Sequence, residues 1–120
     1  MTHDARRTTN PITFDDFLTV DIRVGRIIAA RFNPAAIKPA LHLEVDFGGE
    51  LGVKHSSAQL TVHYTPESLV GRLVVAVVNF ASKRIAGVNS EVLVLGVPDP
   101  DGAVVLLHPD HDVPLGGRMF

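Results

Sequence analysis

The sequence has 120 residues, a length typical of a single domain. With 46% hydrophobic and 20% charged residues it can bury a substantial core, which excludes an intrinsically disordered chain. It contains no Cys, which excludes disulfides, thiolate metal sites, Cys nucleophiles and iron–sulfur clusters.

The formal net charge is −2, from 11 basic and 13 acidic residues. The chain therefore lacks the overall basicity of proteins that bind nucleic acid through bulk electrostatics, and a site for a polyanion must be a local patch. The first residues contain no apolar leader, and the longest apolar run, 73–78, is too short to cross a membrane. We expect a soluble, cytoplasmic protein that does not insert into membranes.

The N-terminal part begins with polar residues 1–12, which predict a flexible lead-in to one domain over residues 13–120. Thr13 is followed closely by Asp15 and Asp16, and acidic residues favour the first turn of a helix. This pattern predicts one helical turn over residues 14–18. A strand follows from Asp21, with Ile22 and Val24 on one face. Ile27 and Ala29 rejoin that face only if one residue is inserted near Gly25, which predicts a glycine bulge.

The middle of the chain alternates apolar and polar residues over 41–47, which predicts the clearest strand. Gly48-Gly49 allows a tight turn, after which Leu51, Val53 and His55 alternate with Gly52, Lys54 and Ser56. These features predict a hairpin. Thr65-Pro66 predicts the start of a short helix that ends at Gly71.

The rest of the chain predicts three more strands. Residues 73–78 are apolar throughout, as in a strand buried on both faces. Residues 92–97 and 103–107 flank the turn sequence Pro98-Asp99-Pro100-Asp101-Gly102, which predicts another hairpin. Five or six short strands, with one helix between the third and the fourth, outline an all-β Greek-key barrel of the OB type. An SH3-like barrel or a small sandwich fits the strand count nearly as well.

Catalytic patterns are missing from the sequence. There is no G-x-S-x-G elbow, H-E-x-x-H helix, Walker loop or G-x-G-x-x-G, so we expect neither an enzyme nor a cofactor. The segment 108–112, His-Pro-Asp-His-Asp, carries potential metal ligands. It lacks a separated third ligand and contains a proline, so we expect a solvated loop and no metal.

Two polar clusters are candidate binding residues. The first lies in the connection after the apolar strand and contains Asn79, Phe80, Lys83, Arg84, Asn89, Ser90 and Glu91. In an OB barrel such connections border the usual binding groove, where cations engage phosphates or carboxylates and an aromatic ring offers a stacking surface. The alternative is a solvated loop with Phe80 in the core. The second cluster contains Lys54, Ser56, Ser57 and Gln59, for which ordinary turn chemistry is the alternative.

Several motifs resemble one known family. Val20-Asp21-Ile22-Arg23-Val24-Gly25, Lys38-Pro39-Ala40 and Val78-Asn79-Phe80 look like the tRNA-binding domain family, which includes C-terminal appendages of methionyl-tRNA synthetases. Within it, the segments 54–61 and 84–96 resemble the CsaA-like, secretion-associated chaperone branch. The tRNA-binding members carry Ser-Glu-Gly-Met where this chain has Ser90-Glu91-Val92-Leu93. That departure weakens the expectation of tRNA binding.

The resemblance implies a five-stranded OB fold and a homodimer that pairs its terminal segments. Apolar residues available for pairing are Phe14, Phe17, Leu18, Leu115, Met119 and Phe120, which alternatively cover the barrel of a monomer. CsaA-like proteins are associated with unfolded or exported polypeptides, and the branch implies secretion-pathway partners. A structure-specific tRNA-binding protein that acts in trans is the alternative function.

Overall fold

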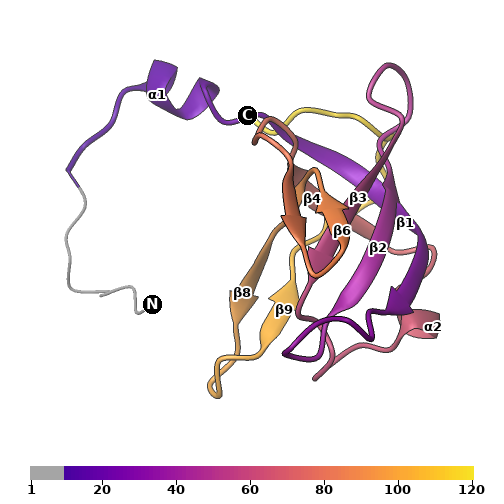
Figure 1. Ribbon diagram of the computed structural model, residues 1–120. Helices are drawn as coiled ribbons and strands as arrows, with labels where there is room; N and C mark the ends of the chain where they lie inside the picture. Colours follow the sequence, from indigo (N-terminus) through magenta and orange to yellow (C-terminus); the bar gives the residue numbers. More distant parts are fainter. Residues whose placement is uncertain (1–9) are drawn as a thin grey trace.

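The computed structural model describes residues 10–120, so most of the expected lead-in over residues 1–12 lies outside the described residues (Figure 1). Within that range the elements are, in chain order, α1 (Phe14–Leu18), β1 (Ile22–Phe32), β2 (Leu41–Asp46), β3 (Val53–Ala58), α2 (Pro66–Leu69), β4 (Leu73–Val77), β5 (Lys83–Ile85), β6 (Val88–Ser90), β7 (Leu93–Val94), β8 (Gly96–Pro98) and β9 (Val104–Leu106). None of the described helices is long and apolar enough to cross a membrane.

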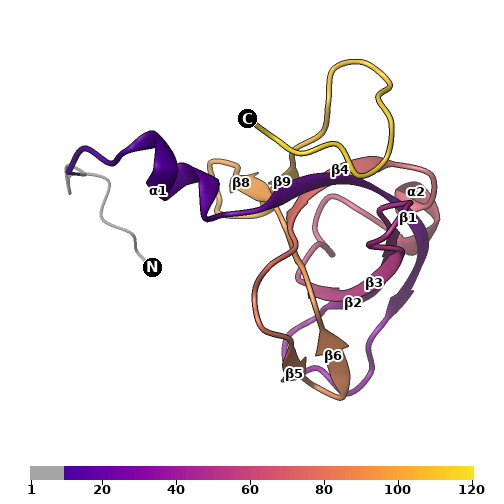
Figure 2. The ribbon, with the colours of Figure 1, turned by 90° about the horizontal axis from the view of Figure 1, so that it is seen from above.

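Five strands form one antiparallel sheet in the order β3-β2-β1-β4-β7. The sheet curls into a barrel, which Figure 2 shows from above. The gap beside β3 is bridged where the Glu91 N–H donates to the His55 carbonyl at 2.8 Å. The all-β OB fold is therefore confirmed, with α2 between β3 and β4 as predicted.

The core follows the alternation that the sequence shows in β2. Leu41, Leu43 and Val45 are fully buried, while the residues between them are partly exposed. Leu69 of α2 is also fully buried and joins this cluster. Each such side chain contributes about 1.5–3 kcal/mol when removed from water, so the barrel interior carries most of the stability.

Gly25 has a different role from the one that the sequence suggested. The expected bulge lies farther along β1 than predicted: β1 pairs regularly with β4 at Gly25, and the register with β2 shifts between Ile27 and Ala29. A Cβ on Gly25 would lie 2.6 Å from Val45 Cγ1 and under 3 Å from the Phe47 ring. Gly25 therefore lets the core side chains of β2 approach the β1 backbone.

Strand β3 turns toward the core the set of side chains that was expected to face solvent. Ser56, rather than His55, is buried, and Val53 is exposed. Ser56 lies opposite core residue Leu43, and His55 lies opposite Glu44 on the outer face. The hydroxyl of Ser56 donates to the Val92 carbonyl at 3.1 Å, which satisfies this buried polar group and ties β3 to the start of β7.

Both short helices begin as predicted. Thr13 and Thr65 are N-caps, each with a capping box in which the side chain accepts from the third helical N–H and the side chain of that residue bonds back. Pro66 occupies the first turn of α2, and Gly71 follows with a φ of 93°. Local sequence chemistry is sufficient for these ends because each cap is made within four residues.

The last strands differ from the expected hairpin in one respect. The strand expected over 92–97 is divided, with β7 pairing with β4 and β8 pairing with β9. Asp99 accepts hydrogen bonds from the N–H groups of Asp101 and Ala103, so the predicted turn is built by an aspartate side chain. The β8–β9 hairpin extends below the barrel in Figure 1.

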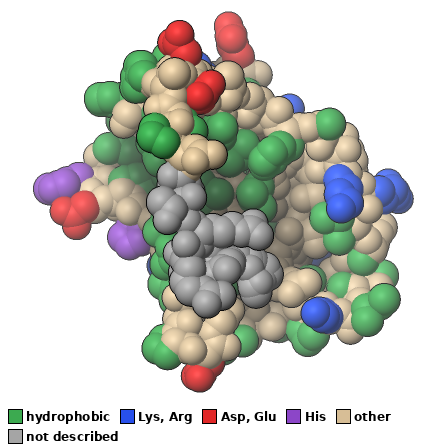
Figure 3. Space-filling model, turned by 90° about the vertical axis from the view of Figure 1, so that its left-hand side faces the viewer, with side chains coloured by type: hydrophobic (Ala, Val, Ile, Leu, Met, Phe, Trp, Pro, Cys, Tyr) green, Lys and Arg blue, Asp and Glu red, His purple; other side chains and the backbone are tan. Residues whose placement is uncertain are grey.

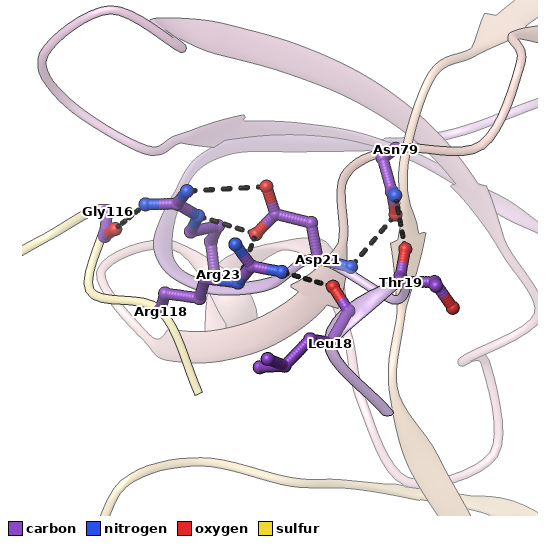
Figure 4. A network of polar contacts seen from close by, with 7 residues as sticks. All are labelled: Leu18, Thr19, Asp21, Arg23, Asn79, Gly116 and Arg118. Carbon is purple, nitrogen blue, oxygen red and sulfur yellow. Dashed lines mark hydrogen bonds and ion pairs between the residues drawn. The ribbon is translucent and has the colours of Figure 1, made fainter. Parts of the chain in front are cut away.

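The two terminal segments meet beside the start of β1. The C-terminal segment runs along β1, where the Val24 N–H donates to Gly117 and the Gly116 N–H donates to Val24. Asp21 accepts from Arg23 at 2.6 Å and lies 3.5 Å from Arg118, which in turn donates to the Leu18 carbonyl (Figure 4). The hydrogen bond from Arg23 holds the pKa of the Asp21 carboxyl below its usual value.

Candidate ligand-binding site

A hollow of about 430 Å³ opens between the β5–β6 hairpin and the side of the barrel, and we call it the hairpin hollow. Its lining consists of Ser57, Phe80, Ala81, Lys83, Ile85, Ser90, Glu91, Val92 and Leu93. Phe80, Ile85 and Leu93 are 57%, 40% and 48% exposed, so the hollow presents apolar surface to solvent. Hydrophobic side chains gather on the face that Figure 3 shows, and Lys and Arg side chains lie at its edge.

The segment expected as a loop from Asn79 to Glu91 contains a strand pair. Lys83, Arg84 and Ile85 of β5 lie opposite Ser90, Asn89 and Val88 of β6. Ala86 and Gly87 make the two-residue turn with φ values of 48° and 83°, the left-handed backbone that such a turn requires. The loop prediction was wrong here because Ala-Gly is a weak signal for this turn.

Pairing in β5 separates the two neighbouring cations. Successive side chains of a strand point to opposite faces, so Lys83 and Ile85 share the face that lines the hairpin hollow, whereas Arg84 points away with Asn89. Both cations are exposed, as expected. Within residues 10–120 neither forms an ion pair with an acid.

The floor of the hollow is held by contacts to β3. The Ser57 N–H donates to the Ser90 hydroxyl at 3.2 Å, and the His55 N–H donates to the Glu91 carboxylate at 3.0 Å. Lys54 lies 3.9 Å from the same carboxylate, so these two charges offset each other. Lys83 also lines the hollow, and it forms no ion pair with an acidic side chain of residues 10–120.

Six of the predicted site residues do not line the hairpin hollow: Lys54, Ser56, Gln59, Asn79, Arg84 and Asn89. Ser56 is buried and bonded to Val92. Gln59 lines a second hollow of about 500 Å³, beneath the hairpin turn, together with Lys38. Asn89 shares the outward face of Arg84. The second hollow is bordered by the β1–β2 loop, which Asn33 ties to the hairpin by donating to the Ala86 carbonyl at 3.1 Å.

The side chain of Asn79 is directed toward the N-terminal segment and away from the hollow. Its carbonyl accepts from the Asp21 N–H at 3.0 Å, and its amide donates to the Thr19 carbonyl at 2.8 Å (Figure 4). The structure therefore gives Asn79 a positioning role, between α1 and the neighbouring Phe80.

A pair of histidines on the outer face of β2 and β3 was missed by the sequence analysis. His42 Nε2 lies 2.7 Å from His55 Nδ1, beside Glu44, which accepts from Arg31 at 2.9 Å. Burial lowers the pKa of His42, and Arg31 and His55 add to the effect. Both residues lie on the polar side of strands, but only the register of the hairpin reveals that they meet.

The C-terminal His and Asp residues do not gather into a cluster. His111 lies 3.5 Å from Asp110, and both side chains are almost fully exposed. In residues 10–120 no group of three or more His, Asp or Glu side chains is arranged to hold a metal ion.

Comparison with known proteins adds three findings. A model of the family described as "Putative tRNA binding domain" matches residues 22–118. A solved structure of the chaperone CsaA from Bacillus anthracis is 50% identical, with a TM-score of 0.82 over 92% of this chain and 100% of that chain. The CsaA chaperone protein from Picrophilus torridus is 46% identical, with a TM-score of 0.84 over 92% of this chain and 100% of that chain.

Curated relatives include the methionine–tRNA ligase of Porphyromonas gingivalis, which is 33% identical over 117 residues. The match covers 98% of this chain and 17% of the ligase. The chain thus spans a small part of the length of that relative.

Proposed function

Since the chain belongs to the tRNA-binding domain family and to its CsaA-like branch, we propose that it is a homodimeric chaperone that binds unfolded or exported polypeptides. In this proposal residues 13–120 act as one non-catalytic binding domain in the cytoplasm, and proteins of a secretion pathway are its partners. The hairpin hollow takes the polypeptide.

The observation that carries this proposal is the composition of the hairpin hollow. Phe80, Ile85 and Leu93 offer exposed apolar surface at one place, next to the cation of Lys83. Unfolded polypeptides differ from folded proteins in exposing apolar side chains, and a hollow with an apolar lining gains free energy by covering them.

A homodimer is supported by the exposure of the terminal segments. Phe14, Leu18, Met119 and Phe120 are exposed, and Phe17 and Leu115 are partly exposed. Pairing these residues across a two-fold axis removes apolar surface from water in both copies. It also places two hairpin hollows on one particle, so that one polypeptide can occupy both.

Binding of tRNA is the second candidate function, favoured by the family match and by the position of Arg84. Arg84 points outward from the hairpin, and Lys38 lies at the second hollow. Outward cations on a surface suit phosphate contacts that read shape rather than sequence. The net charge of −2 limits such binding to this patch.

The two functions are separated by titrating the protein with an unfolded preprotein and with bulk tRNA across a salt series. For the chaperone, Lys83→Ala weakens preprotein binding more than Arg84→Ala, and the salt dependence is shallow because apolar contacts dominate. For tRNA, Arg84→Ala reduces the salt slope by about one unit per lost phosphate contact. Binding of tRNA but not of preprotein by the wild type would overturn the chaperone proposal.

A further inference from the structure

The outer edge of the β5–β6 hairpin is open. β6 lies against β3, whereas β5 pairs only with β6 among the strands of residues 10–120. All three residues of β5 are exposed. An edge strand of this kind is a template on which another extended chain can pair.

The register of the hairpin identifies the free backbone groups. In a two-residue hairpin the residues that flank the turn exchange both hydrogen bonds, and the next pair along the strands exchanges none. Ile85 and Val88 flank the turn, so Lys83 and Ile85 bond to β6 while the N–H and C=O of Arg84 point to the open edge.

The open edge borders the hairpin hollow. A chain that pairs with β5 has one residue directly opposite Ile85, and the two side chains then share the face of the hollow. The residue opposite Arg84 has its side chain on the outward face. Every second side chain of an added strand therefore meets the apolar lining, and those between them meet the guanidinium.

Charge on the edge selects the partner. Lys83 and Arg84 are adjacent on β5, so two copies of this edge repel each other and do not pair with one another. The same charges attract a strand that carries carboxylates.

We propose that the β5 edge accepts an extended segment of an unfolded polypeptide as an added antiparallel strand, with apolar residues toward the hairpin hollow and acidic residues opposite Arg84. This inference rests on the proposed chaperone function and specifies how the polypeptide is held. The hydrogen bonds of Arg84 supply backbone recognition that is independent of sequence, and the hollow supplies the preference for apolar side chains.

The test uses a capped peptide of about eight residues that alternates Glu and Val, long enough for one strand. Residues that pair directly have their side chains on the same face, so the side chain of the Glu residue opposite Arg84 lies on the outward face. The backbone N–H of that Glu residue donates to the Arg84 carbonyl. N-methylation of the Glu amides is therefore expected to weaken binding roughly threefold to tenfold for each lost hydrogen bond. N-methylation of the Val amides, which face away from β5, is the matched control.

A second arm changes the protein. Arg84→Pro removes the outward N–H without removing a hydrogen bond of the hairpin, and proline is tolerated at strand edges. Arg84→Ala removes the charge and keeps the N–H. We expect Arg84→Pro to bind the unmethylated peptide more weakly than Arg84→Ala does. If the proline variant fails to fold, as judged by circular dichroism, the binding of the methylated peptides to the wild-type protein still tests strand addition.

The outcomes distinguish this inference from the proposed function. If the wild type binds neither the unfolded preprotein nor the peptide, the proposed function fails and this inference with it. If the preprotein binds but methylation of the Glu and Val amides has equal effects, only strand addition is wrong. A peptide of alternating Lys and Val that binds as tightly as the Glu peptide would overturn the assigned charge preference.

Discussion

The packing of Val45 and Phe47 against β1 depends on the absence of a side chain at Gly25. Its neighbours Val45 and Phe47 occupy the space in which a Cβ would stand. Because a packed core has few voids, an added methyl group there forces side chains out of their preferred rotamers or shifts the strand.

Gly25→Ala is therefore expected to lower the free energy of unfolding by about 1–3 kcal/mol. Urea denaturation monitored by circular dichroism measures this. Gly117→Ala is the control, since a Cβ there would meet only the Pro114 carbonyl at an ordinary 3.6 Å. Equal stability of the two variants would show that β1 shifts at no cost.

His42 carries a pH dependence of stability. Its pKa is lowered in the folded state by burial, by Arg31 and by His55, with Glu44 acting in the opposite direction. The folded state therefore binds fewer protons than the unfolded state, in which the pKa is about 6.5. Stability is retained above that value and is lost as the pH falls through it toward the lower pKa of the folded state.

Thermal unfolding measured between about pH 8 and pH 5 tests this expectation. The melting temperature should decrease as the pH is lowered below about 6.5. Replacing the ring by a neutral amide, His42→Gln, is expected to flatten part of the profile. A profile that is identical in wild type and variant would exclude His42 as a source of the acid sensitivity.

At the scale of elements, α1 depends on contacts made outside itself. A helix of five residues is unstable alone, and none of its residues is buried. Its position is held by Asn79 through Thr19 and Asp21, and by Arg118 through the Leu18 carbonyl. The end of β4 therefore positions both α1 and the adjacent Phe80.

Asn79→Ala is expected to increase amide hydrogen exchange in residues 13–21 at least several-fold, because the variant leaves the Asp21 N–H and the Thr19 carbonyl without these partners. Exchange in β2 and β4 should stay unchanged. Asn89→Ala, on the exposed face of the hairpin, is the control. Protection of residues 13–21 as in the wild type would show that Arg118 and the capping box suffice.

At the scale of the whole molecule, both ends of the described chain expose large apolar side chains. Phe14 is 65% exposed and Phe120 is 99% exposed. Single exposed apolar residues are ordinary, but several near meeting terminal segments are typical of an interaction surface. The proposed homodimer would cover them.

Light scattering at micromolar concentration is expected to report a dimer for the wild type and a monomer, or a much weaker dimer, for the double variant Phe14→Ser, Phe120→Ser. Each buried Phe contributes about 1.5–3 kcal/mol, so losing four from a symmetric interface is decisive. Val62→Ser removes an apolar side chain that is 74% exposed but outside the terminal segments, and should leave the dimer intact. A monomeric wild type would contradict the proposal.

Local signals in the sequence were sufficient for the framework. The alternation of Leu41, Leu43 and Val45 predicted strand β2, and Thr13 and Thr65 predicted both helix starts, because each signal acts through neighbours in the chain. The strand count and the helix between the third and fourth strands left an SH3-like barrel or a small sandwich open, and the resemblance to the tRNA-binding domain family implied the OB fold that the structure has. The sequence also singled out the segment from Phe80 to Glu91, part of which lines the hairpin hollow, although it predicted a loop there.

Tertiary structure alone decided which of those residues share a surface. The register of β5 with β6 separates Lys83 from Arg84, and the register of β2 with β3 brings His42 to His55 and turns Ser56 inward. A shift of one residue in strand pairing moves every side chain to the other face. The two-residue turn at Ala86 and Gly87 fixes the first register. The second register places Leu43 and Ser56 in the core, where Ser56 bonds to Val92 of a segment distant in the sequence.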